Sequence, residues 1–271
     1  MSALITRPPP WPRGLESLRV LAVAFQFLTR LPVPQIPVVD GDLRRATAAF
    51  PVVGVVVGGC AWLVFAGLHV VLGPMVAAVG AIATAVTVTG AFHEDGLADT
   101  FDGLWGGWSP EQRLTIMRDS RLGTYGAAAL ALMLLGQVVV LADVDVALAA
   151  RALVAGHVLG RAAVLVQIRA LPPVGDQGSG ARVAEPIGGL GLVFASVVTA
   201  AVIVAAAGVG AVVLVVLALV AVGLMRRAAR RKLGGLTGDI LGATQQIALL
   251  LVMAGVVALD GVVALDGVAR S

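Results

Sequence analysis

Charged residues are scarce in this sequence of 271 residues: Asp, Glu, Lys and Arg make up 13% of it, whereas hydrophobic residues make up 59%. Soluble domains carry about 25% charged residues, so this composition excludes a water-soluble globular protein, and its hydrophobicity excludes a disordered chain. Cysteine occurs once, at Cys60, which excludes a disulfide-stabilised scaffold. A net charge of +3, from 19 basic and 16 acidic residues, is too balanced for a nucleic-acid-binding protein. The class that remains is a polytopic membrane protein.

Long apolar runs predict an all-α, polytopic membrane bundle, because each transmembrane helix needs about 20 mostly apolar residues. The run 46–92 has no charged side chain and is interrupted at Gly73-Pro74, so it predicts two spans. The run 191–225 is also long enough for two spans, with a turn near Gly208. About seven transmembrane helices are therefore predicted, at 48–72, 75–92, 122–142, 146–168, two within 191–225, and 240–259.

The segments outside these spans complete the predicted organisation. Residues 1–14 are rich in Pro and Arg and predict a flexible arm. The apolar stretch 15–31 is short and flanked by Arg19 and Arg30, which favours an interfacial or re-entrant helix. We therefore expect a single membrane catalytic domain over 15–259, followed by a polar tail at 260–271.

The basic residues are distributed unevenly between the two ends of the predicted spans. One side collects the N-terminus and the loops 93–121, 169–190 and 226–239, and it holds 16 of the 19 Arg and Lys residues. Loops rich in Lys and Arg stay in the cytoplasm, so this side is predicted to be cytoplasmic. The acidic motif lies on the same side, which places a candidate active site on the cytoplasmic face.

An acidic motif follows the second predicted span. Asp95, Asp99 and Asp102 have the spacing i, i+4, i+7, which places them within roughly 60° of arc on one helical face. Like charges on one face repel, and Mg²⁺ offsets such repulsion by bridging carboxylates to substrate phosphates. The alternative is a solvated acidic face. A solvated acidic face is disfavoured because acidic residues are scarce in this chain, yet 5 of the 16 fall within 94–111.

Two further polar elements lie on the same predicted side of the membrane. Arg118 and Arg121 are of the type that neutralises charge on a transferring phosphoryl group, although they could also be anchors beside the next span. The Gly-rich turn at 234–238, with Thr237, leads to Asp239 and favours a second metal or phosphate element. The alternative for Asp239 is a simple helix N-cap.

One predicted span carries Arg151, His157 and Arg161. Charges inside a membrane helix are costly and are usually functional or paired. His157 and Arg161 are four residues apart, so both could face an interior polar cavity. The alternative for Arg151 is snorkelling, or a structural pair with Asp143 or Asp145.

The sequence resembles a known family. The stretch 93–107, HEDGLADTFDGLWGG, is similar to the signature of the cobalamin synthase (adenosylcobinamide-GDP ribazoletransferase) family. The segments 25–34, 50–54, 117–126 and 234–243 agree with that family in order and spacing. The resemblance implies an integral enzyme of the bacterial cytoplasmic membrane. Such an enzyme joins adenosylcobinamide-GDP to α-ribazole, or to its 5′-phosphate. The products are adenosylcobalamin, or its 5′-phosphate, and GMP, and the reaction uses Mg²⁺.

This resemblance implies a role for each candidate residue. The metal ligands would be Asp95, Asp99, Asp102 and Asp239. Arg118 and Arg121 would neutralise the leaving GMP, and His93 or Glu94 would accept the proton of the attacking hydroxyl. Substrate contacts are expected from Asp119, Thr237, Arg161 and Arg182, the last in a candidate lid at 171–189.

Two competing interpretations use the same features differently. A CDP-alcohol phosphotransferase also places spaced Asp residues and Mg²⁺ on a membrane helix, but its motif has Arg where this chain has Asp99. A transporter would more often place its polar groups near mid-membrane than in a cytoplasmic loop. The expected partners are the two substrates and membrane lipid, with no nucleic acid. A homo-oligomer, or association with other enzymes of the cobalamin pathway, could add to these.

Overall fold

The computed structural model describes residues 16–39, 41–174 and 186–270, and within these ranges the fold is all-α. An isolated bridge between Pro173 and Leu236 is the one β-type pairing in the described part of the chain. The elements in chain order are α1 (Glu16–Leu28), α2 (Asp42–Ala46), η1 (Thr47–Ala49), α3 (Phe50–Thr89), α4 (Phe92–Gly106), α5 (Pro110–Met117), α6 (Thr124–Leu141), α7 (Val146–Ala170), α9 (Gly189–Ala207), η2 (Gly208–Gly210), α10 (Ala211–Lys232) and α11 (Gly238–Arg270).

Five helical stretches of the described chain are long and apolar enough to cross a membrane, which confirms the membrane class. They are Asp42–Thr89, Thr124–Leu141, Val146–Ala170, Gly189–Lys232 and Gly238–Val262. Two of the five, of 48 and 44 residues, are interrupted by glycines with positive φ, at Gly73 (79°) and Gly208 (52°). Both breaks lie where the sequence predicts a turn. The count of seven spans stays a prediction, because five helical stretches of the described chain are long and apolar enough to cross a membrane.

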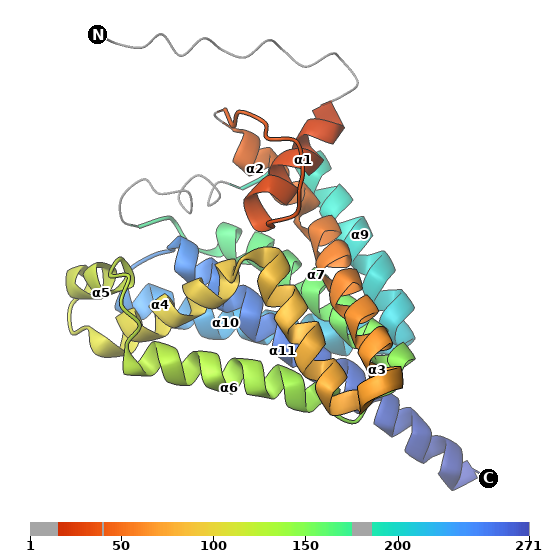
Figure 1. Cartoon of the computed structure of the whole chain (residues 1–271). Helices are drawn as coiled ribbons and strands as arrows, with labels where there is room; N and C mark the ends of the chain where they lie inside the picture. Colours follow the sequence, from red (N-terminus) through yellow and green to blue (C-terminus); the bar gives the residue numbers. More distant parts are fainter. Residues whose placement is uncertain (1–15, 40, 175–185, 271) are drawn as a thin grey trace.

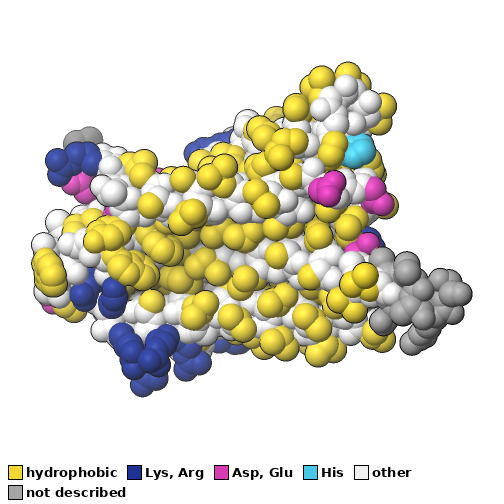
Figure 2. All heavy atoms as spheres, turned by 90° about the horizontal axis from the view of Figure 1, so that it is seen from below, with side chains coloured by type: hydrophobic (Ala, Val, Ile, Leu, Met, Phe, Trp, Pro, Cys, Tyr) yellow, Lys and Arg dark blue, Asp and Glu magenta, His cyan; other side chains and the backbone are white. Residues whose placement is uncertain are grey.

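Helices α7 and α11 form the centre of the bundle, since 72% of the residues in the most apolar window of each are buried. The corresponding share is between 22% and 28% in α3, α6 and the α9–α10 stretch, so these helices leave most of their apolar surface exposed. In Figure 2 hydrophobic side chains cover much of the visible face, and charged side chains lie toward its two ends. An apolar surface of this kind suits contact with lipid.

Small residues allow α7 to approach both of its main neighbours closely. A Cβ atom added at Gly54 or Gly58 of α3 would lie within 3 Å of the α7 backbone. A Cβ added at Gly156 or Gly160 of α7 would lie within 3 Å of α11. Pairs of glycines four residues apart form a flat strip on a membrane helix, along which a second helix packs at short range. The central position of α7 therefore depends on glycines, which have no side chain to hold the neighbouring helices apart.

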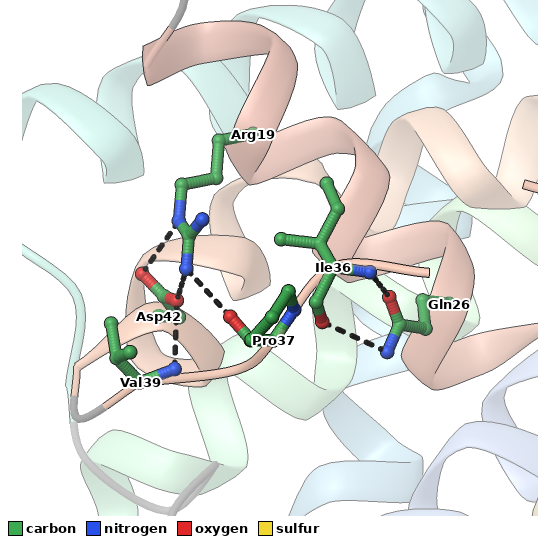
Figure 3. A network of polar contacts seen from close by, with 6 residues as sticks. All are labelled: Arg19, Gln26, Ile36, Pro37, Val39 and Asp42. Atoms are coloured by element: carbon green, nitrogen blue, oxygen red, sulfur yellow. Dashed lines mark hydrogen bonds and ion pairs between the residues drawn. The ribbon is translucent and has the colours of Figure 1, made fainter. Parts of the chain in front are cut away.

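The helix predicted to be interfacial is α1, which has 13 residues and is too short to cross a membrane. Figure 3 shows how the loop after α1 is held: Arg19 pairs with Asp42 at 2.5 Å and also donates to the Pro37 carbonyl. The Gln26 side chain bonds both backbone groups of Ile36, accepting from its N–H at 2.9 Å. These contacts hold the loop after α1 and the start of α2 against α1.

The last helix is longer than the sequence suggests. Residues 260–270, predicted to be a polar tail, continue α11 as helix. Arg151 of α7 pairs with Asp260 at 2.6 Å and donates to the Ala206 carbonyl. Its partner is therefore in α11, and the alternative pairing with Asp143 or Asp145 is wrong. In Figure 1 this end of α11 lies at the lower right, far from α4 and α5.

Candidate active site

The acidic motif lies in a separate helix, because the backbone leaves the helical conformation just before it. Gly90 and Ala91 both have left-handed backbone conformations, with φ of 64° and 57°. Gly90 ends α3, and Ala91 adopts a conformation that costs a non-glycine residue about 1–2 kcal/mol. Helix α4 then starts at Phe92 and is not among the candidate spans. The motif is therefore helical, as predicted, and lies beside the ends of the spanning helices.

Two glycines bring α4 into direct backbone contact with α11. A Cβ at Gly96 would lie 3.1 Å from the Cα of Asp239, and a Cβ at Gly242 would lie 3.2 Å from the carbonyl oxygen of His93. The helices can cross this closely only because both positions lack side chains. The crossing places Asp239, from the far end of the sequence, beside the α4 acids.

Asp99 is influenced by the charges of the other α4 acids and of Asp239. Asp99 is half-buried, and its pKa is raised to about 7, chiefly by desolvation and then by the negative charges of Asp95, Asp239 and Asp102. A carboxyl group with carboxylate neighbours resists ionisation, so a positive charge placed among them is favoured. Helix α4 and the start of α11 both contribute negative charge around Asp99, and a single metal site formed by them stays a prediction.

The donor set fits Mg²⁺ in chemical type. Among the described residues, no three His, Cys, Asp or Glu side chains are grouped closely enough to hold a metal ion by themselves. Mg²⁺ needs fewer protein ligands, because it keeps several waters and is usually held by one or two carboxylates together with substrate phosphates. Asp95, Asp99 and Asp239 supply such carboxylates. The metal itself stays a prediction.

Asp102 differs from the other acids because both of its carboxylate oxygens accept backbone hydrogen bonds. The Gly123 N–H donates at 2.7 Å and the Gly126 N–H at 2.8 Å. Both glycines are needed there, since a Cβ on either would lie within 2.5 Å of an Asp102 oxygen. Asp102 therefore holds the N-terminal end of α6 against α4, where a negative charge also opposes the positive end of the helix dipole. The structure gives this predicted ligand a structural task.

The loop between α5 and α6 carries the predicted cationic residues. Arg121 pairs with Asp119 at 2.5 Å, and Arg118 and Arg121 are both exposed. The hydrogen bonds from Arg121 lower the pKa of Asp119 to about 2. Asp119, predicted to contact substrate, thus orients a neighbouring arginine. Asp102 thus fixes the end of this loop at Gly123, two residues after Arg121.

His93 and Glu94 face the interior of the bundle, where their exposed fractions are 4% and 8%. Burial lowers the pKa of His93 well below its ordinary value, with smaller effects from Arg161 and His157. Burial raises the pKa of Glu94. At 100° per residue, His93 lies on nearly the opposite side of α4 from Asp95. The two candidate bases therefore belong to a buried polar cluster beneath the acidic face.

A chain of glutamines supports Glu94, and sequence reasoning did not find it. Gln246 of α11 donates to a Glu94 oxygen at 2.8 Å, and Gln137 of α6 donates to Gln246 at 2.9 Å. All three side chains are buried. The available signal was the presence of amides within apolar runs, because polar groups inside membrane helices are usually retained for a partner.

Arg161 is fully buried in α7, and it is only partly hydrogen-bonded. Its Nη1 group donates to the His157 carbonyl at 3.1 Å and lies 3.1 Å from His157 Nδ1. In the described part of the chain, its Nε and Nη2 groups have no hydrogen-bond partner. An unpaired donor on a buried charged group costs more than the 1–3 kcal/mol typical of a neutral one. Arg161 therefore lies in the bundle interior with two donor groups that no described residue uses, and a polar cavity around it stays a prediction.

The start of α11 is built by Thr237 and the turn before it. The Thr237 hydroxyl accepts from the Ile240 N–H at 3.3 Å, so Thr237 is the N-cap and Asp239 lies in the first turn. Gly235 packs so closely on the loop after α7 that its Cβ would lie 2.5 Å from the Pro172 carbonyl oxygen. Arg182 and most of the predicted lid lie outside the described residues.

Comparison with known proteins identifies the family. The model of the family described as Cobalamin-5-phosphate synthase matches residues 20–268. The chain belongs to this family. The adenosylcobinamide-GDP ribazoletransferase of Azorhizobium caulinodans is 41% identical over 254 residues, which cover 88% of this chain and 96% of the relative. That of Bradyrhizobium diazoefficiens is 42% identical over 251 residues, covering 89% and 96%. No solved structure matches the chain.

Membership of the cobalamin-5-phosphate synthase family confirms the resemblance seen in the sequence. The matched region contains the crossing of α4 and α11, the arginine loop and the buried polar cluster. The competing interpretations, a CDP-alcohol phosphotransferase and a transporter, are therefore set aside. In this synthase fold the acids of the motif gather near Asp239, whereas Asp102 and Thr237 organise the helix starts around them.

Proposed function

We propose that this protein transfers the phosphoryl-cobinamide part of adenosylcobinamide-GDP to α-ribazole or to its 5′-phosphate. The ribazole 3′-hydroxyl forms a bond to the phosphorus nearest cobinamide, and the bond from that phosphorus to the bridging oxygen breaks. GMP leaves with that oxygen, and the hydroxyl proton passes to a protein base. The observation that carries this proposal is the meeting of Asp95 and Asp99 with Asp239 in a chain of this family.

The acidic cluster suits a magnesium-dependent reaction. Asp95, Asp99 and Asp239 would hold Mg²⁺, which supplies positive charge against the oxygens of the substrate pyrophosphate. Without a cation, the same carboxylates would repel that pyrophosphate. Asp102 contributes mainly by holding the loop of Arg118 and Arg121, whose guanidinium groups neutralise charge that develops on the leaving GMP.

The proton acceptor is His93 or Glu94, and both have properties suited to the task. Because burial lowers the pKa of His93, its imidazole is neutral near pH 7 and can take a proton. Because burial raises the pKa of Glu94, its carboxylate is a stronger base than an exposed one. Glu94 also has one buried oxygen, Oε2, with no hydrogen-bond partner among the described residues.

The active site is proposed to face the cytoplasm of a bacterial cell. Arg226, Arg227, Arg230 and Arg231 are exposed at the C-terminal end of α10, just before the turn that leads to Asp239. A cluster of this kind beside a spanning helix is typical of the cytoplasmic end. Homo-oligomer formation and docking of other pathway enzymes stay predictions.

The direct test uses purified protein in lipid nanodiscs with adenosylcobinamide-GDP, α-ribazole and Mg²⁺. We expect GMP and adenosylcobalamin to form in equal amounts, and EDTA to stop the reaction. Asp95→Ala and Asp99→Ala should each lower the rate by a factor on the order of 100 or more. Asp143→Ala, an exposed acid in the connection between α6 and α7, is the matched control. Turnover that survives in both motif variants would rule out the metal assignment.

A further inference from the structure

The C-terminal end of α10 carries a cluster of arginines to which the transfer reaction assigns no task. Its four exposed residues, called the arginine face below, are Arg226, Arg227, Arg230 and Arg231. Within the described part of the chain, none of these four side chains makes an ion pair or a hydrogen bond. Helices α9 and α10 contain no acidic residue that could neutralise them. The positive charge of this face is therefore available to an anion from outside the described residues.

The arginine face lies on the same side of α10 as a stripe of exposed apolar residues. The apolar stripe consists of Val212, Val216, Leu219, Val220 and Leu224, which are between 45% and 70% exposed. At 100° per residue, the stripe and the arginine face fall within roughly 160° of arc. Residues on the opposite side of the helix, among them Leu214, Ala218 and Met225, are buried in the bundle. The stripe and the arginines are thus consecutive parts of one outward-facing surface.

The apolar stripe has about the length of one lipid leaflet. Residues 212–224 rise by about 18 Å along the helix axis, and half of the bilayer hydrocarbon core is about 15 Å thick. Because α10 belongs to a stretch that can cross a membrane, we expect the stripe to meet acyl chains and the arginine face to lie at the depth of the headgroups. In Figure 2 most of the Lys and Arg side chains of the visible face lie toward one end, beyond the hydrophobic surface.

The spacing of the arginines suits phosphate groups. Arg226 and Arg230 are four residues apart, as are Arg227 and Arg231, and residues with this spacing are neighbours on a helix surface. A guanidinium group donates two parallel hydrogen bonds to phosphate oxygens, so each pair can hold one phosphate. Four positive charges favour a headgroup with a net negative charge, because a zwitterionic headgroup brings a cation of its own.

We propose that the arginine face and the apolar stripe form a binding site for an anionic phospholipid in the leaflet at this end of α10. The lipid phosphate accepts hydrogen bonds from the arginines, and the acyl chains lie along the stripe. This site is distinct from the acidic cluster and takes no part in the proposed transfer. It gives the protein a preference among membrane lipids, in addition to the general contact that any membrane helix makes with them.

The other partners that could meet this surface fit only part of it. A nucleotide or a free phosphate would contact the arginines and leave the apolar stripe unused. An acidic soluble protein would likewise have no access to the stripe at the depth of the acyl chains. A second copy of the chain, packed by the same face about a two-fold axis, would place arginines close to arginines. An anionic phospholipid matches both the charge and the apolar part.

The same helix end is connected to the acidic helix on its other side. Lys232 follows the arginine face, and its Nζ donates to the Leu104 carbonyl at 2.6 Å and lies 4.3 Å from the centre of the Trp105 ring. Arg113 of α5 donates to the Lys232 carbonyl at 2.8 Å. A lipid on the arginine face therefore holds the part of α10 against which α4 and α5 rest. Because a ligand of the folded state stabilises it, the lipid should also raise the unfolding temperature.

The test titrates the detergent-solubilised, full-length protein with phosphatidylglycerol or with phosphatidylcholine of the same acyl chains, and counts bound lipids by native mass spectrometry. Arg227→Gln/Arg231→Gln should raise the apparent Kd for phosphatidylglycerol roughly tenfold or more, because two charges at the headgroup are lost. The Kd for phosphatidylcholine should change less than about twofold. Arg44→Gln/Arg45→Gln, which removes two charges from α2, is the matched control and should leave both constants within about twofold.

Three results would overturn the proposal. The first is equal affinity of the wild-type protein for the two lipids, and the second is unchanged phosphatidylglycerol affinity in a folded Arg227→Gln/Arg231→Gln protein. The third is displacement of the lipid by glycerol phosphate, which would identify a site for soluble anions. If the first variant does not fold, Arg226→Gln/Arg230→Gln applies the same test to the neighbouring pair. None of these measurements uses a substrate, so their outcome is independent of the proposed function.

Discussion

Asp99 and Asp102 are identical side chains on one helical face, but their electrostatic surroundings are opposite. Asp99 meets three other carboxylates, and their charge together with burial raises its pKa to about 7. Asp102 meets two backbone N–H groups at 2.7 and 2.8 Å, which stabilise its negative charge. The first carboxylate is destabilised by its neighbours, whereas the second is already satisfied by the protein.

Substituting each of these residues by asparagine separates the two roles. Asp102→Asn turns an amide donor toward a backbone N–H, so we expect the free energy of unfolding to fall by about 2 kcal/mol. Asp99→Asn removes one of several repelling charges, so stability should be unchanged or higher while product formation is lost. Thermal unfolding of the detergent-solubilised proteins and the transfer assay measure the two effects. Equal loss of stability in both variants would contradict this division of roles.

At the scale of elements, the active site depends on how closely α4 and α11 cross. The contact at Gly96 and Gly242 leaves no space for a side chain, since a Cβ at Gly96 would be 3.1 Å from the Asp239 Cα. The same kind of contact seats α7 against α3 at Gly54 and Gly58. Close packing of small residues is the general means by which membrane helices associate, because lipid offers no hydrophobic driving force.

Enlarging Gly96 should therefore impair the reaction before it impairs the fold. Gly96→Val forces α4 away from α11 and moves Asp239 relative to Asp95 and Asp99. We expect the rate to fall at least tenfold, because small misplacements of reacting groups are costly. The control is Gly59→Val in α3, where an added Cβ meets nothing within 4 Å. A Gly96→Val protein that keeps full activity would show that the distance between the helices is not critical.

At the scale of the whole molecule, the proposed active site lies at one end of the bundle. Helices α4 and α5 and the arginine loop lie away from the Gly73 break of α3 and the C-terminal end of α11, which Figure 1 shows at the lower right. The central helices α7 and α11 are largely buried, and the surrounding helices expose apolar side chains. This arrangement is that of a membrane protein, and we expect its reaction to take place at one surface.

The proposed orientation can be measured with a membrane-impermeant maleimide. In a Cys60→Ala background, Ser120→Cys places a thiol in the exposed loop before α6, and Val209→Cys places one in the turn before α10, where Val209 is 99% exposed. We expect Ser120→Cys to react only in inverted membrane vesicles and Val209→Cys only in intact spheroplasts. The reverse pattern would mean that the active site faces outward.

The sequence by itself determined the class of the protein and the helix that carries the candidate metal ligands. Apolar runs encode membrane helices locally, because every backbone group in lipid must bond within its own segment. The spacing of Asp95, Asp99 and Asp102 likewise predicts a shared helical face, and the helix α4 is present. The breaks at Gly73 and Gly208 were also predictable, since glycine tolerates a positive φ.

Only the tertiary structure decided what those residues meet. The hydrogen bonds of Asp102 reach Gly123, and the Gln246 side chain reaches Glu94, although these pairs are 21 and 152 residues apart in the chain. The unpartnered donors of Arg161 and the rings around Phe27 likewise come together only when α1, α3, α4 and α7 pack. Such contacts depend on how closely whole helices approach one another, and the periodicity of a single segment carries no information about that distance.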